Sequence, residues 1–161
     1  MSRIIETFPF DGVVLVDMQD KFVPALRPGA ADRIIPHHQV VLRRCREKNV
    51  PTAVLEFERQ GSTVTPLLNL VRETPNHSFF EKPTPTGFYN FKFIDWLEDL
   101  GGLRILLLGI NAGACIMANA VDMLRYGFDV YTSPDLIAGQ ASHQEDDYIG
   151  WYREKCKVFD M

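Results

Sequence analysis

The chain has 161 residues, and its shares of hydrophobic residues (46%) and charged residues (24%) are close to the average of globular proteins. We therefore expect a single domain over residues 1–161 with a packed core. The formal net charge of −4 comes from both signs scattered along the chain. This argues against a nucleic-acid-binding protein, which would carry a clustered basic face.

The sequence also argues against a membrane or secreted protein. No run of about 18 apolar residues occurs, so we expect no membrane partner. The N-terminal segment has too short an apolar run for a secretory signal and carries acidic residues. Cys45, Cys115 and Cys156 are widely spaced and form no CxxC pair, which argues against a disulfide scaffold or a zinc–thiolate site. Together these features predict a cytoplasmic protein.

Strands and helices alternate from the start of the chain. Residues 13–16 are a continuous apolar run, which is typical of a strand covered on both faces. Residues 30–49 carry an apolar stripe at helical spacing, and Pro36 predicts that the regular helix begins near it. Residues 51–57 form the second expected strand.

The alternation continues to the end of the chain. We expect helices at 67–71, 89–100, 115–127 and, weakly, 142–152, strands at 78–81, 105–108, 128–132 and 155–159, and a loop at 134–139. This order predicts an α/β domain with a mainly parallel sheet between layers of helices.

The most informative stretch, residues 103–127, reads as strand, small-residue turn and helix. Cys115 stands at the helix start, where unpaired backbone N–H groups and the helix dipole favour a thiolate. On this stretch alone, Cys115 could equally be one more small buried residue, which is the commoner fate of a free cysteine.

Two other ionisable residues follow strands of the expected sheet. Asp17 follows the first strand and Lys82 the third, while Cys115 follows the fourth. Taken singly, such an Asp is usually a turn former and such a Lys a solvated charge. Because the carboxyl ends of parallel strands meet at one edge, we expect all three in one cleft.

The three groups together suit acyl transfer by a thiolate. Asp17 can take the thiol proton if burial raises its pKa, and Lys82 can stabilise both anions. The N–H groups of Ala114 and Cys115 can hold an oxyanion. We expect attack on the amide carbonyl of a small-molecule substrate, a thioester intermediate and then hydrolysis, with Phe22 and Phe88 as candidate pocket walls.

Three segments contain these residues in turn: VVLVDMQDKF, SFFEKPTPTGFYN and GINAGACIMANAVDMLRYGFDVY. They resemble the isochorismatase-like cysteine hydrolase family, which includes nicotinamidases and related amidases. The resemblance runs in order over residues 13–139. It implies a three-layer α/β/α, Rossmann-like fold with a six-stranded, mainly parallel sheet of order 3-2-1-4-5-6.

The resemblance also implies roles for particular residues. Asp17 would be the general base, Lys82 its charged partner and Cys115 the nucleophile. The turn before the cysteine would contain a non-proline cis peptide bond between Ile110 and Asn111. Family members commonly assemble, and together with the many aromatic residues this predicts a homo-oligomer.

The sequence departs from the family pattern in two places. Nicotinamidases bind a metal through an Asp-x-His pair after the second strand and a further His, whereas this region reads EFERQGS. Glu56, Glu58 and His77 do not reproduce that pattern, so we expect no metal and no cofactor. The turn carries Ala112-Gly113 where a polar pair is usual, which favours a substrate other than nicotinamide.

Two alternatives to an amidase remain open at this point. The chain could keep the fold as a binding or scaffold protein with weak or no catalysis. It could also be a redox-active thiol protein in which Cys115 forms a sulfenic acid, with Cys156 as a possible resolving partner. The neighbouring His37 and His38 are expected to be surface groups or caps rather than metal ligands.

Overall fold

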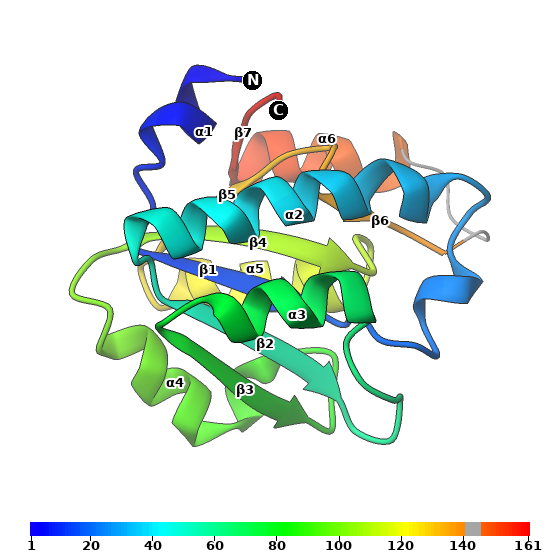
Figure 1. The fold of residues 1–161 in the computed structure, drawn as a ribbon, viewed down its shortest axis with the longest axis horizontal. Helices are drawn as coiled ribbons and strands as arrows, with labels where there is room; N and C mark the ends of the chain where they lie inside the picture. The colour runs from blue at the N-terminus through cyan, green and yellow to red at the C-terminus, as the bar shows by residue number, and fades with distance from the viewer. Residues whose placement is uncertain (141–145) are drawn as a thin grey trace.

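The computed structural model describes residues 1–140 and 146–161. Their strands form one parallel sheet of order β3-β2-β1-β4-β5-β7, with β6 paired beside β4 (Figure 1). The strands are β1 (Gly12–Val16), β2 (Thr52–Phe57), β3 (His77–Lys82), β4 (Arg104–Ile110), β5 (Asp129–Thr132), β6 (Ile137–Ala138) and β7 (Lys157–Val158). The predicted parallel sheet and its strand order are confirmed.

Helices cover both faces of this sheet (Figure 1). They are α1 (Arg3–Thr7), α2 (Ala30–Lys48), α3 (Thr65–Glu73), α4 (Phe91–Glu98), α5 (Cys115–Arg125), α6 (Asp146–Lys155) and the 3-10 turns η1 (Val23–Ala25) and η2 (Gly87–Tyr89). One buried cluster packs α1, α2 and α3 on one face, and a second packs α4, α5 and α6 on the other. This gives the expected three layers. No helix of the described residues has the length and apolarity that crossing a membrane requires.

The central strands show why the sequence folds this way. All five residues of β1 are buried, as are six of the seven in β4, because each strand is covered by helices on both faces. Their side chains alternate between the two clusters: Val13 and Leu15 face α2, while Val14 and Val16 face α5.

Three details differ from the sequence predictions. The helix α2 begins at Ala30 rather than near Pro36, because the proline removes only one backbone donor while the apolar stripe packs on both sides of it. The expected loop at 134–139 contains β6, which is too short to show an alternating pattern. Of the segment expected to be helical at 142–152, residues 142–145 lie outside the described residues, and α6 begins at Asp146.

Candidate active site

A buried ion pair lies at the carboxyl edge of the sheet. Asp17 directly follows β1 and has a left-handed backbone (φ 54°), and Lys82 is the last residue of β3. The Nζ atom of Lys82 donates to Asp17 Oδ2 at 2.9 Å, and the two side chains are 0% and 1% exposed. Lys82 also donates to the Thr84 carbonyl at 3.3 Å and lies 4.4 Å from the ring centre of Phe57.

Cys115 lies beside this pair as the first residue of α5, and it is 7% exposed. Its thiol interacts with both Asp17 and Lys82, since each of these groups shifts its pKa. The preceding Gly113 and Ala114 are exposed, so the approach to the sulfur is bordered by small residues. The structure thus brings together the three side chains that the strand ends predict.

The protonation states of the site follow from burial. Burial and the nearby Asp17 carboxylate raise the pKa of Cys115 to about 12, while Lys82 opposes the rise. This shift favours the protonated thiol, whereas the helix start alone would favour a thiolate. Burial also raises the pKa of Asp17, and the Lys82 ammonium offsets part of this effect.

The turn before Cys115 contains the predicted cis peptide bond between Ile110 and Asn111. The N–H of Ala114 donates to the Asn111 carbonyl at 3.0 Å, so it is already engaged. The N–H of Cys115 has no hydrogen-bond acceptor among the described residues. Of the two N–H groups expected to hold an oxyanion, only that of Cys115 is therefore unengaged.

The turn can form only with a glycine at position 109. Gly109 has φ 127°, and a Cβ atom there would lie 2.1 Å from the Val16 carbonyl oxygen. This close approach of β4 to β1 places the Cys115 turn next to Asp17.

Two fully buried side chains that the sequence reading missed organise the surrounding loops. Gln19 donates to the carbonyls of Phe57 and Gly61, at 2.9 and 2.8 Å, and accepts from the Phe57 N–H. Asn119 accepts from the Gly87 N–H and donates to the carbonyls of Pro85 and Cys115. Gln19 stands two residues after Asp17, and Asn119 stands one helical turn after Cys115. This proximity was the available signal, but an isolated amide in a sequence does not reveal its partners.

The two expected pocket aromatics lie in different places. Phe22 packs edge-on against Phe57, the ring beneath Lys82, and so lies beside the buried pair. Phe88 packs against Phe93 and against Tyr126, which follows the last turn of α5, at the far end of that helix from Cys115. The structure therefore brings Phe22 to the site but not Phe88.

Glu56 in β2 and His77 at the start of β3 have structural partners. Glu56 accepts from the N–H and the hydroxyl of Thr63, at 2.7 and 3.0 Å. The His77 ring is hydrogen-bonded to the Thr74 carbonyl. No cluster of three or more metal-ligating side chains occurs within residues 1–140 and 146–161.

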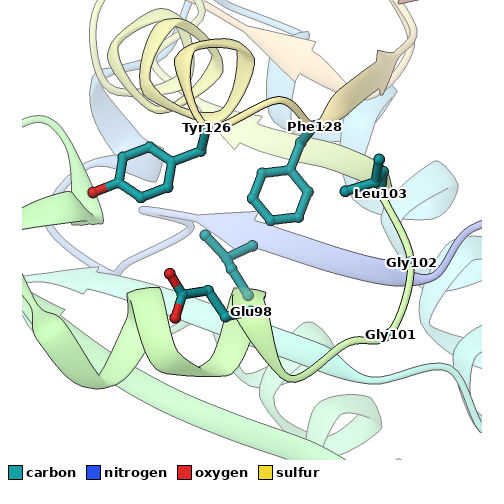
Figure 2. Close-up of a pocket in the computed structure, with 7 residues that line it drawn as sticks. Glu98, Gly101, Gly102, Leu103, Tyr126 and Phe128 are labelled. Atoms are coloured by element: carbon teal, nitrogen blue, oxygen red, sulfur yellow. The ribbon is translucent and has the colours of Figure 1, made fainter.

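A hollow at the opposite edge of the sheet is separate from this site. Figure 2 shows it between the end of α4 and the start of β4, with Glu98, Tyr126, Leu103 and Phe128 around it. Because it lies at the amino end of β4, it cannot receive a substrate that reacts with Cys115.

The fold and this arrangement of residues agree with a known family. Residues 11–153 match the family model described as the isochorismatase domain, and the chain belongs to this family. No curated protein matches the chain by sequence alone.

Solved structures share the fold at low sequence identity. N-carbamoylsarcosine amidase from Thermoplasma acidophilum has a TM-score of 0.78 at 17% identity, covering 92% of this chain and 95% of that one. Pyrazinamidase from Pyrococcus horikoshii, in complex with zinc, has a TM-score of 0.74 at 24% identity over 93% and 98% of the two chains. The ycaC gene product of Escherichia coli, an octameric hydrolase of unknown specificity, has a TM-score of 0.74 at 16% identity over 92% and 74%.

Proposed function

We propose that this protein is a cysteine hydrolase that cleaves the C–N bond of a small amide through a thioester on Cys115. The observation that carries the proposal is the fully buried Asp17–Lys82 pair, 2.9 Å apart and in electrostatic contact with the Cys115 thiol. The amidase activities named for two structural relatives support the choice of an amide.

In the first half-reaction, the Sγ atom of Cys115 bonds to the amide carbonyl carbon as its proton passes to an Asp17 carboxylate oxygen. The C–N bond breaks when the departing nitrogen takes this proton, which leaves a thioester. A base that both accepts and returns the proton suits a carboxyl whose pKa is raised by burial.

In the second half-reaction, Asp17 takes a proton from water while the water oxygen bonds to the thioester carbon. The C–S bond then breaks, and the sulfur recovers the proton from Asp17. Lys82 stays charged throughout, holds the Asp17 carboxylate by its 2.9 Å hydrogen bond and lowers the energy of the anionic sulfur.

The developing oxyanion needs donors in the turn formed by Ile110, Asn111 and Ala114 and at the helix start. We propose that the unengaged N–H of Cys115, together with the dipole of the eleven-residue helix α5, supplies this stabilisation. Ala114 contributes by its small side chain rather than by its N–H, which is bonded to Asn111.

The test is hydrolysis of a panel of small amides, followed by ammonia or amine release. Wild-type turnover should disappear in Cys115→Ala and fall by about 100-fold or more in Asp17→Asn. Cys45→Ala is the matched control, because Cys45 is buried on the opposite face of the sheet. Turnover that survives Cys115→Ala would contradict the proposal, and no turnover on any amide would favour the binding-protein alternative.

We further propose that the protein acts as a cytoplasmic homo-oligomer. The octameric ycaC gene product supports the assembly, as do two strongly exposed aromatic side chains, Tyr89 (69%) and Phe91 (79%). Light scattering after size exclusion should give a mass of at least two chains of 18.4 kDa, and a monomer at micromolar concentration would contradict the assembly.

A further inference from the structure

Two polar side chains of α2 bind the backbone of residues 134–138 on one face of the sheet. His38 is fully buried, and its Nε2–H donates to the Leu136 carbonyl at 2.8 Å. Arg33 donates to the carbonyl of Pro134 and, at 3.3 Å, to that of Ile137. The expectation that His38 is a surface group is therefore wrong, because the apolar stripe of α2 turns this position toward the sheet.

The same short segment holds the turn that carries the nucleophile. The Leu136 carbonyl that accepts from His38 also accepts from the Gly109 N–H at 3.0 Å. The Ala138 carbonyl accepts from the Ala112 N–H at 2.9 Å. A single carbonyl group, that of Leu136, therefore links the His38 side chain to the backbone of the turn.

The other helical layer contacts the turn from the opposite face. The Tyr152 hydroxyl of α6 donates to the Ala112 carbonyl. Helix α2 is in contact with β6, the strand paired beside β4 (Figure 1). The turn is thus bonded from both sides, by α2 through residues 134–138 and by α6 directly.

The hydrogen bonding of His38 indicates that its imidazole acts as a specific hydrogen-bond donor and does not merely fill space in the core. Its partner is a carbonyl, so the ring proton is on Nε2, and the buried Nδ1 has no hydrogen-bond partner among the described residues. An apolar residue would fill this space without leaving such an atom unbonded. Among the described residues, the only hydrogen bond of the ring therefore goes to the Leu136 carbonyl.

We propose that His38 is a positioning residue for the reaction proposed above: it fixes the Leu136 carbonyl, which fixes Gly109 and hence the turn that presents Cys115. Small shifts of a nucleophile reduce turnover steeply. His38 touches neither the substrate nor the thiol in this account.

Three variants test the inference. His38→Leu removes the donor and keeps the bulk, and His38→Gln returns an N–H donor at similar reach. Val41→Ala is the matched control, since Val41 is fully buried one turn further along α2 in the same cluster and has no polar side chain. It loses core packing but makes no side-chain hydrogen bond to residues 134–138.

The first readout is amide hydrogen exchange, which needs no substrate. In His38→Leu, the Gly109 and Ala112 amides should exchange about 10-fold faster relative to those of β1. His38→Gln should restore the slow exchange, and Val41→Ala should not change this ratio. An unchanged ratio in His38→Leu, an equal change in Val41→Ala or no recovery in His38→Gln would overturn the proposal.

The second readout is turnover of a small amide. His38→Leu should lower kcat about 10-fold with KM within two-fold, because the turn moves but the pocket walls remain. An unchanged kcat, or an equal fall in Val41→Ala, would overturn the positioning role. If the wild type hydrolyses no amide, the proposed function fails, and the exchange rates alone decide whether His38 holds the turn.

Discussion

The Nζ atom of Lys82 lies 2.9 Å from Asp17 Oδ2, although strand β2 separates the strands that carry these two residues. The lysine reaches its partner by crossing the ring of Phe57, the β2 residue beside it in register. Both charges are out of contact with water, so each depends on the other. An unpaired buried charge is among the most destabilising features a protein can carry.

Replacement of Lys82 should therefore reveal this dependence. Lys82→Met keeps the apolar stem and leaves the Asp17 carboxylate without its cation, which should lower the free energy of unfolding by about 3–5 kcal/mol. Urea unfolding followed by circular dichroism measures the change. Lys92→Met, at an exposed lysine, should alter it by less than about 0.5 kcal/mol.

The double variant Lys82→Met with Asp17→Asn distinguishes the effect of an unpaired charge on stability from the effect of lost packing. It should recover at least half of the stability lost in Lys82→Met, because no unpaired charge remains. A double variant as unstable as the single one would show that the loss comes from packing instead.

The pKa of His38 predicts a pH-dependent stability. Burial lowers it from 6.5 to about 4, so between these values the unfolded chain binds more protons than the folded one. Stability should therefore fall as the pH drops through this window, by about 2 kcal/mol at pH 5.

His38→Gln supplies the comparison for this effect. The variant keeps every other ionisable group, including His37 and Arg33 on the same helix, so the difference between the two unfolding curves isolates His38. The wild type should lose stability relative to the variant between pH 7 and 5. Parallel curves would contradict the assignment of a neutral, buried imidazole.

Asn119 should support the loop beside Cys115. Asn119→Leu leaves the Gly87 N–H and the Pro85 carbonyl without their partner, which should lower the free energy of unfolding by about 2 kcal/mol. It should also accelerate exchange of the Gly87 amide. Slow exchange at Gly87 in this variant would mean that the loop is held by other contacts.

The sequence is enough to predict the sheet, because the central strands are continuous apolar runs and the helices carry clear apolar stripes. The convergence of Asp17, Lys82 and Cys115 follows from that topology, since parallel strands end at one edge. The geometry of the ion pair depends on the side chain of Lys82 crossing Phe57, which no pattern in the chain encodes.

The remaining features depend on contacts between distant segments. Strand β6 exists because two residues pair with Gly109 and Ile110, about 28 positions earlier. The raised pKa of Cys115 follows from its burial beside Asp17, a long-range contact that the helix start does not reveal. His38 is buried because of the way α2 is rotated about its axis on the sheet. The sequence alone does not show which of the two adjacent histidines, His37 or His38, faces the sheet.

The most direct test of the central claim is mass spectrometry of the acid-quenched enzyme during hydrolysis of an active amide. The account predicts a mass increase equal to the acyl group on the peptide that contains Cys115, labile to hydroxylamine as a thioester is. In Asp17→Asn this adduct should form more slowly, and in Cys115→Ala it should be absent together with turnover. Steady turnover in Cys115→Ala, or an adduct confined to Cys45 or Cys156, would contradict the account.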